Sequence, residues 1–303
     1  MSKAKKGVYA AAITSIGADG EPDLKRLVNY CRGLIAAGCD GVAPLGTTGE
    51  AAALPFLFRQ RVPEALAAAG IAPDAVILGA GSPSLGDAIA IGKASLAAGY
   101  SNLLVLPPYY TKEPSDEGLY DYYSRIIEAL GDSRLHLYLY HIPQVTMVPI
   151  SHALVARLRD KFGRIIAGIK DSSGNFDSAK SYVGPEDFDV YPSTEAVLTA
   201  GLAAGCAGVI SGSTNISAAL ARDVLRASGA EREALQARLT DFRQTIQKFP
   251  LIPAVKQVHA WRTGDSGWLR MLPPLRGLSA EQTASLRREM ERLGQIGDAR
   301  DAA

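Results

Sequence analysis

The chain has 303 residues and a formal net charge of +1, with 32 basic and 31 acidic side chains. This balance provides no strongly positive surface for nucleic acid or for an anionic membrane, so neither is expected as a partner. Hydrophobic residues make up 47% of the chain and charged residues 21%, which is typical of a globular protein with a sizeable core.

Cysteine usage and the start of the chain bear on its compartment. Cys31, Cys39 and Cys206 are far apart and form no C-x-x-C pair, so we expect reduced, buried thiols and no thiolate metal site. The basic N-terminus lacks the apolar segment of a signal peptide, and no apolar run approaches the ~20 residues needed to cross a bilayer. A cytoplasmic protein without a membrane partner is expected.

Short apolar segments recur along the first two thirds of the chain. Three of them follow an Ala-Ala-Gly sequence, in which the glycine is expected to end a helix before a buried strand. The candidate strands, in chain order, cover residues 8–13, 42–45, 75–80, 103–106, 135–140, 165–169, 189–191 and 209–211. Their spacing is close to the roughly 30 residues of a βα unit.

The intervals between these strands have helical periodicity. Apolar residues recur at helical spacing over residues 24–35 and 119–130, and Ser115 and Ser151 occupy candidate N-cap positions. Such alternation predicts an α/β fold, either a parallel (β/α)8 TIM barrel or a doubly wound sheet. The number of candidate strands favours the barrel.

The strand pattern ends after Ser211. Residues 217–295 have the pattern of three or four helices, and Ser279 to Gln282 form a capping box at the start of the last one. Residues 297–303 are expected to be a frayed tail. We therefore predict a catalytic barrel over residues 1–215 and a C-terminal helical extension, packed on the barrel, over residues 216–303.

Lys170 lies at the end of a predicted strand, where a barrel of this kind has its active site. The apolar run before it should bury its backbone and place its amine in a confined site. Such a site favours the neutral amine, which is the nucleophilic form. The alternative is a structural lysine paired with Asp171 or another carboxylate, and position alone leaves both open.

Other strand ends also carry polar residues. The sequence Gly46-Thr-Thr-Gly49 could bind a carboxylate through backbone N–H groups and hydroxyls, or its threonines could cap the next helix. Tyr109, Tyr110 and Tyr140 could each be packed with a satisfied hydroxyl, or offer that hydroxyl to a ligand. His141 belongs to no H-x-x-x-H pattern, so no metal site is expected.

Taken together, five ordered motifs resemble the dihydrodipicolinate synthase/N-acetylneuraminate lyase family of class I aldolases, and the likeness covers nearly the whole chain. The motifs are Gly46-Thr-Thr-Gly-Glu50, Pro108-Tyr-Tyr110, Tyr140-x-x-Pro143, Gly168-Ile-Lys-Asp171 and Gly208-Val-Ile-Ser211. The resemblance implies a lyase that uses pyruvate or another 2-keto acid together with an aldehyde, without a cofactor. It also implies a homo-oligomer, either a dimer or a tetramer.

The resemblance assigns roles to individual residues. Lys170 is similar to the lysine that forms a Schiff base with pyruvate, Tyr140 to the tyrosine that relays protons, and Thr47 to its partner in that relay. Tyr110 is similar to a tyrosine that completes the relay across a dimer interface. The residues it places in substrate binding are Thr47, Thr48 and Ile210 for the keto acid, and Ser193, Glu195, Ser211, Asn215, His141 and Val145 for the second substrate.

Three positions depart from true dihydrodipicolinate synthases. Val145 stands where those enzymes have an arginine that clamps a carboxylate, and an aliphatic side chain cannot make that bidentate contact. His141 replaces an asparagine and Met147 replaces a glycine. These changes disfavour 4-hydroxy-tetrahydrodipicolinate synthesis. The Gly-Thr-Thr-Gly-Glu loop also differs from the Gly-Ser-Thr-Gly-Glu of neuraminate-type members.

We therefore expect a pyruvate-dependent class I aldolase for a 2-keto-3-deoxy sugar acid or a related 4-hydroxy-2-keto acid. A 2-keto-3-deoxy acid dehydratase would use the same lysine and the same enamine, and the sequence does not separate the two. The third alternative is a non-catalytic keto-acid binding protein. The changes at Val145 and Met147 favour it, whereas the intact Lys170, Tyr140 and Thr47 oppose it.

Overall fold

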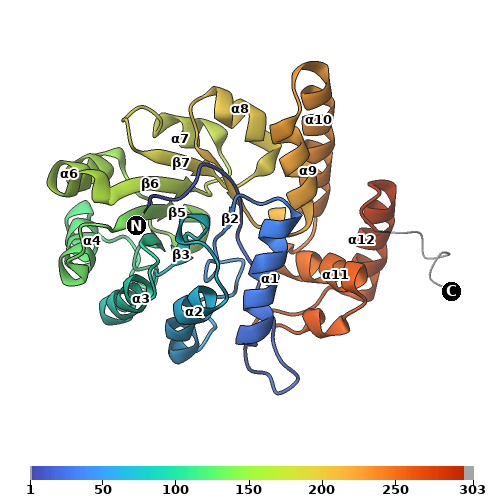
Figure 1. Ribbon diagram of the computed structural model, residues 1–303, viewed down its shortest axis with the longest axis horizontal. Coiled ribbons are helices and arrows are strands. Elements are labelled where there is room, and N and C mark those ends of the chain that lie inside the picture. The colour runs from blue at the N-terminus through green and yellow to red at the C-terminus, as the bar shows by residue number, and fades with distance from the viewer. Residues whose placement is uncertain (1, 297–303) are drawn as a thin grey trace.

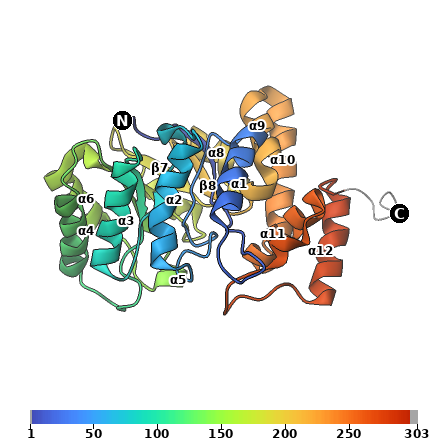
Figure 2. The ribbon, with the colours of Figure 1, turned by 60° about the horizontal axis from the view of Figure 1, so that its bottom comes forward.

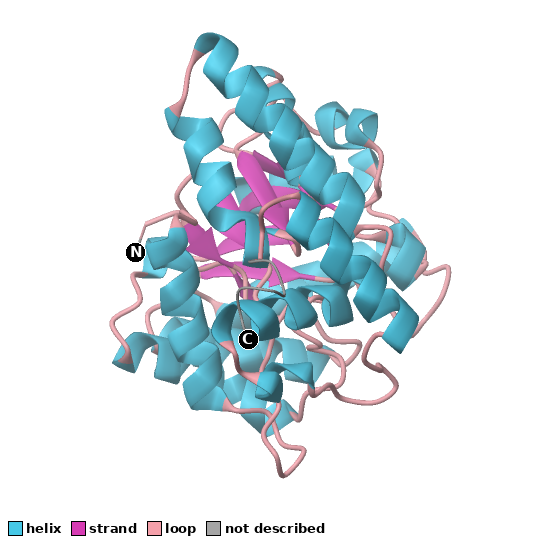
Figure 3. Cartoon of the chain, turned by 90° about the vertical axis from the view of Figure 1, so that its right-hand side faces the viewer, coloured by secondary structure: helices cyan, strands magenta, loops and turns pink. Residues whose placement is uncertain are grey.

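The computed structural model describes residues 2–296, which contain eight parallel strands surrounded by helices (Figures 1 and 3). The strands are β1 (Gly7–Ala10), β2 (Gly41–Val42), β3 (Leu78–Gly79), β4 (Asn102–Val105), β5 (His136–His141), β6 (Ile166–Asp171), β7 (Asp189–Pro192) and β8 (Gly208–Ser211). They form two ladders, β2-β1-β8 and β3-β4-β5-β6-β7. A bridge between Val42 and Val76 joins the ladders on one side. On the other side the Ala207 N–H donates to the Val190 carbonyl at 2.9 Å. The predicted (β/α)8 barrel is confirmed.

The outer helices of the barrel follow the strands in chain order. They are α1 (Leu24–Ala37), α2 (Phe56–Ala68), α3 (Leu85–Ala97), α4 (Asp116–Leu130), the short α5 (Pro143–Thr146), α6 (His152–Phe162), α7 (Phe176–Ser181), α8 (Leu198–Ala203) and α9 (Thr214–Arg226). The predicted N-caps are confirmed, since the Ser115 hydroxyl accepts from the Gly118 N–H at 3.1 Å and the Ser151 hydroxyl from the Leu154 N–H at 3.0 Å.

The C-terminal part of the described chain consists of α10 (Gly229–Ile246), α11 (Leu251–Thr263) and α12 (Ala280–Arg292), which lie on one side of the barrel (Figure 2). The predicted capping box from Ser279 to Gln282 is present at the start of α12. Position 215, where we expect the barrel to end, lies inside α9, which packs against β1 and α1 as a barrel helix. The division into a barrel and a C-terminal extension therefore stays a prediction. The frayed tail expected at residues 297–303 lies outside the described residues.

Three strands are shorter than their apolar segments. The strand β1 ends at Ala10, within the segment 8–13. In the segment 42–45, β2 ends at Val42 because Pro44 has no N–H to donate and Leu45 has a φ of 59°. In the segment 75–80, only Leu78–Gly79 forms a strand, and the residues before it include the 3₁₀ turn Pro73–Ala75. The apolar pattern therefore located buried backbone correctly but overestimated the length of these ladders.

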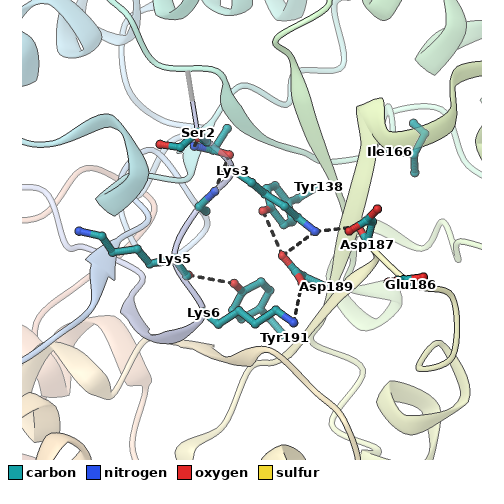
Figure 4. A network of polar contacts seen from close by, with 12 residues as sticks. Ser2, Lys3, Lys5, Lys6, Tyr138, Ile166, Glu186, Asp187, Asp189 and Tyr191 are labelled. Atoms are coloured by element: carbon teal, nitrogen blue, oxygen red, sulfur yellow. Dashed lines mark hydrogen bonds and ion pairs between the residues drawn. The ribbon is translucent and has the colours of Figure 1, made fainter.

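Tyrosines fill the lower half of the barrel interior, at the N-terminal ends of the strands. The ring centroid of Tyr191 lies 5.8 Å from that of Tyr9 and 6.1 Å from that of Tyr138, in edge-to-face geometry. Figure 4 shows the N-terminal segment beside Tyr138 and Tyr191. The Lys3 ammonium lies 2.9 Å from the Asp189 carboxylate. Side chains therefore fill this end of the barrel interior.

An aromatic cluster joins the C-terminal helices to the barrel. His259 of α11 lies with its ring centroid 4.8 Å from that of Tyr30 on α1 and 4.6 Å from that of Trp268. Burial, with help from the charges of Arg262 and Arg26, lowers the pKa of His259 from 6.5 to about 4. The imidazole is therefore neutral in the folded protein near pH 7.

This shift predicts a pH-dependent stability. Between pH 6.5 and pH 4 the unfolded chain binds a proton at His259 and the folded chain does not, so the free energy of unfolding falls as the pH drops through this window. We expect His259→Phe to remove that contribution, so that Tm measured by calorimetry from pH 7 to pH 4.5 decreases less steeply than in the wild type. Equal slopes for the two proteins would contradict this account.

No helix in the part of the chain that the structure describes is long and apolar enough to span a membrane. The same residues contain no group of three or more His, Cys, Asp or Glu side chains arranged to hold a metal ion.

Candidate active site

Lys170 and Tyr140 occupy neighbouring positions on adjacent strands. Tyr140 of β5 is the register partner of Lys170 of β6, so both side chains project to the same side of the ladder. The Lys170 ammonium donates to the Tyr140 hydroxyl at 3.1 Å and lies 4.2 Å from the centre of its ring. Both residues are buried, with 3% of the surface of each exposed. The strand register thus creates a secluded amine beside a phenol.

The Asp171 carboxylate is occupied elsewhere. It accepts from the Ser173 N–H at 2.8 Å and from the Ser178 hydroxyl at 2.6 Å, on the opposite face of β6 from Lys170. Within residues 2–296, Lys170 makes no ion pair. The structure therefore does not support the alternative of a lysine held by Asp171.

Tyr140 also contacts the loop after β2, because its hydroxyl lies 3.4 Å from the Thr47 hydroxyl. Burial by itself raises the pKa of Tyr140, but the positive charge of Lys170 and the hydrogen bonds from Thr47 and Lys170 outweigh it. The pKa of Tyr140 consequently lies below its usual value. A phenol of this kind, hydrogen-bonded to both an amine and a hydroxyl, is suited to proton transfer.

The loop Gly46–Glu50 carries both threonines. Thr48 packs against the loop after β8, where a Cβ on Gly212 would lie 3.0 Å from the Thr48 hydroxyl oxygen. The Thr14 hydroxyl fixes the loop further by donating to the Gly49 carbonyl at 2.7 Å. The loop is therefore held at the barrel mouth on two sides.

Glu50 anchors the end of this loop from a left-handed backbone position, with a φ of 59°. One carboxylate oxygen pairs with the Lys256 ammonium of α11, and the other accepts from the Leu272 N–H at 3.0 Å. Lys256 is completely buried and also donates to the Arg270 carbonyl at 2.9 Å. Burial lowers the pKa of Lys256, although the Glu50 charge opposes this shift.

Sequence reasoning assigned no role to Lys256. The only signal was a single lysine within the apolar residues 251–258, with no acidic residue nearby in sequence. Its partner lies 206 positions away, so local spacing could not reveal the pair.

A cavity of about 420 Å³ lies beside Thr47 and Tyr140 at the barrel mouth. Most of its lining side chains are apolar: Leu45, Ala51, Ala52, Ala53, Leu104, Leu106, Val145, Ile252, Leu272, Pro274 and Leu275. Val145, one of the predicted site residues, therefore forms part of the wall. Four of the lining residues, Ile252, Leu272, Pro274 and Leu275, come from the C-terminal part of the chain.

Three predicted binding residues on β7 and β8 lie deeper in the barrel or at its edge. Ile210 fills the barrel interior, and the Ser211 hydroxyl lies 3.1 Å from that of Ser213. Ser193 is half-buried directly after β7. Ile210, Ser211 and Ser193 do not line the cavity beside Tyr140.

Three other predicted binding residues are also absent from the lining of this cavity. His141 follows the inward-facing Tyr140, so the alternation of the strand turns it outward, and its Nδ1 accepts from the Ile150 N–H at 3.0 Å. Glu195 is fully buried and accepts from the Ser217 hydroxyl of α9 at 3.0 Å. The Asn215 amide donates to the Ala11 carbonyl at 2.8 Å, so it joins α9 to β1.

Tyr110 is the one predicted catalytic residue that this single chain does not bring to the site. Its side chain is 83% exposed on the turn after β4, whereas Lys170, Tyr140 and Thr47 lie in contact.

The fold and the cluster define a class of protein, namely barrel enzymes whose reactive groups lie at the carboxyl ends of parallel strands. A sequence profile of the dihydrodipicolinate synthetase family matches residues 4–293, and the chain belongs to that family. The family consists of lyases of the aldolase type.

Individual relatives agree with this assignment. The chain is 34% identical to an uncharacterised DapA-like lyase of Chloroflexus aurantiacus, over 95% of this chain and 97% of that protein. It is 32% identical to a 4-hydroxy-tetrahydrodipicolinate synthase of Nitrosospira multiformis, over 95% of this chain and 96% of that one.

Solved structures show the same fold. The crystal structure of dihydrodipicolinate synthase from Agrobacterium tumefaciens matches with a TM-score of 0.85 and 32% identity, over 95% of this chain and 99% of that chain. YagE of E. coli K12, at 24% identity, matches with a TM-score of 0.87 over 96% of this chain and 99% of that chain. At that identity, the likeness to YagE concerns the fold alone.

The ion pair between Glu50 and Lys256 generates a stability prediction. Lys256→Met leaves a buried carboxylate without its countercharge, so we expect the free energy of unfolding to fall by about 3–5 kcal/mol in urea denaturation. The double variant Glu50→Leu/Lys256→Met should lose less stability, because no unpaired charge remains.

The matched control is Lys161→Met, which breaks an exposed ion pair with Glu128 and should change the free energy of unfolding little. A loss for Lys256→Met no greater than that of the control would contradict the anchoring role.

Proposed function

We propose that this chain is a pyruvate-dependent class I aldolase that acts, through a Schiff base on Lys170, on a 2-keto-3-deoxy sugar acid or a related 4-hydroxy-2-keto acid. The observation that carries the proposal is the buried Lys170 amine, without a carboxylate partner in the described chain, 3.1 Å from a phenol whose pKa is lowered. An amine of this kind is suited to attack a carbonyl, and the adjacent phenol can supply and remove the necessary protons.

The first half of the reaction joins the enzyme to pyruvate. The neutral Lys170 amine attacks C2 and passes one of its protons to the C2 oxygen, which gives the carbinolamine. Tyr140 then gives a second proton to this oxygen, which leaves as water and so forms the iminium ion. The hydroxyls of Thr47 and Thr48 hold the carboxylate. The Tyr140 phenolate then removes a C3 proton, and the iminium accepts the electron pair of that C–H bond, which produces an enamine.

The second half forms or breaks the C3–C4 bond. In the direction of synthesis, C3 of the enamine attacks the aldehyde carbon, and the aldehyde oxygen takes a proton from Tyr140 to become the C4 hydroxyl. Water then adds to the iminium, releasing the 4-hydroxy-2-keto acid and the free Lys170 amine. Cleavage runs through the same steps in reverse.

A dehydratase would begin with the same iminium and enamine but would expel the C4 hydroxyl as water. The 4-hydroxy-tetrahydrodipicolinate synthase activity named for relatives such as that of Nitrosospira multiformis is a further candidate. The apolar Val145 in the cavity wall disfavours it, because a second carboxylate has no cation to bind there.

Pyruvate release tests the proposal. With a panel of 4-hydroxy-2-keto acids, we expect the wild type to release pyruvate, measured by coupled oxidation of NADH, and Lys170→Met to release none above background. Tyr140→Phe retains the amine and should lower kcat by about 10²–10⁴-fold. A C4-deoxygenated keto acid in place of pyruvate would instead identify a dehydratase. Undiminished release by Lys170→Met would rule out the Schiff base.

We also propose that Tyr110 serves the site of a second copy of the chain in a homo-oligomer, since its exposed ring has no role in its own site. Tyr110→Phe should then lower kcat while sedimentation velocity shows an unchanged oligomer. Full activity of a verified monomer would contradict this role.

A further inference from the structure

The wall of the cavity beside Tyr140 leaves few polar groups for a ligand. The Thr146 hydroxyl donates to the Ile142 carbonyl at 3.1 Å and accepts from the Val148 N–H at 3.2 Å. Glu50, which alone among the described lining residues is charged, has one oxygen paired with Lys256 and the other hydrogen-bonded to backbone. The Thr146 hydroxyl and the Glu50 carboxylate are therefore already hydrogen-bonded within the protein and are not available to bind a substrate.

The polar side chains that remain beside the cavity lie at its reactive end or its rim. Thr47 and Tyr140 mark the reactive end, next to Lys170. Tyr109 is half-buried, and burial raises the pKa of its hydroxyl, so that it stays a neutral phenol. The rest of the wall consists of aliphatic side chains, with Val145 among them.

We propose that the aldehyde partner carries an apolar substituent, either an aromatic ring or an aliphatic chain, and that this substituent occupies the cavity. The 4-hydroxy-2-keto acid would then carry that apolar group at C4, in place of the hydroxyls of a sugar acid or a second carboxylate. The inference rests on the proposed pyruvate lyase and specifies its second substrate.

Cavity size and wall chemistry both favour such a group. A volume of about 420 Å³ lies within the range of small-molecule sites, which are lined mostly by apolar side chains. An apolar ring gains from leaving water in such a site. A hydroxyl or carboxylate in contact with the aliphatic part of this wall would lose its water without gaining a hydrogen-bond partner there, which disfavours such a group by about tenfold or more.

In the direction of cleavage, the C4 hydroxyl gives its proton to Tyr140 and the C3–C4 bond breaks. The electron pair of the C3–C4 bond enters the enamine, and the apolar aldehyde leaves. C3 then takes up the proton that Tyr140 received, and addition of water to the iminium releases pyruvate and the free Lys170 amine. The step needs no oxidant or reductant.

Aldehyde competition tests the inference. With pyruvate as the partner, we expect kcat/KM for benzaldehyde or pentanal to exceed that for glyceraldehyde and for succinic semialdehyde by about tenfold or more. A preference for glyceraldehyde, or for the semialdehyde, would overturn it.

Two arginine variants test whether the apolar substituent of the aldehyde binds in this cavity. Val145→Arg places a cation in the cavity wall and should lower kcat/KM for benzaldehyde by about tenfold while raising that for succinic semialdehyde. Met147→Arg is the matched control, because Met147 is 62% exposed and lies outside the cavity lining, and it should change neither value. Equal effects of the two substitutions would contradict binding in this cavity.

A measurement made without any aldehyde distinguishes failure of this inference from failure of the proposed function. Enamine formation exchanges the methyl protons of pyruvate with solvent, so the pyruvate methyl signal should disappear in D₂O when the enzyme is added. Absence of exchange contradicts the proposed function itself. Exchange combined with a preference for polar aldehydes, or with no turnover of any of the four, overturns only the apolar-substrate inference.

Discussion

The hydrogen bond between the Lys170 amine and the Tyr140 hydroxyl is the contact around which the site is arranged. It exists because β5 and β6 pair in a register that sets these residues side by side within the barrel mouth. A lysine alone at this depth would be a costly buried charge, and a tyrosine alone would be a packed phenol. Together they lower the pKa of the phenol and hold an amine ready for a carbonyl.

The rest of the structure protects and orients this pair. Tyrosines fill the lower end of the barrel interior, beside the N-terminal segment. The ion pair between Glu50 and Lys256 ties the threonine loop to α11, so the C-terminal helices help to shape the site. The same arrangement brings Ile252 and Leu272 to the cavity wall, so the C-terminal part of the chain would influence the choice of aldehyde in the proposed reaction.

The apolar runs predicted the barrel and placed Lys170, Tyr140 and Thr47 at the ends of strands, where such barrels have their active sites. Only the resemblance to the family grouped these three residues into one catalytic set. It could not reveal contacts between distant segments, such as the pairing of Lys256 with Glu50. Successive side chains of a strand point to opposite faces, so an inward Tyr140 implies an outward His141. The orientation of His141 was therefore predictable from the sequence. The apolar character of the cavity depends on loops that meet only in the fold, so a sugar-acid substrate and an apolar one looked alike from sequence.

Reductive trapping is a direct test for a Schiff base on Lys170. Borohydride added to the enzyme with pyruvate should convert the iminium into a stable secondary amine, and peptide mass spectrometry should find the added pyruvyl group on Lys170. The account predicts a single modified peptide containing Lys170, formed only when pyruvate is present. Complete absence of an adduct, or an adduct on another lysine that persists in Lys170→Met, would contradict it.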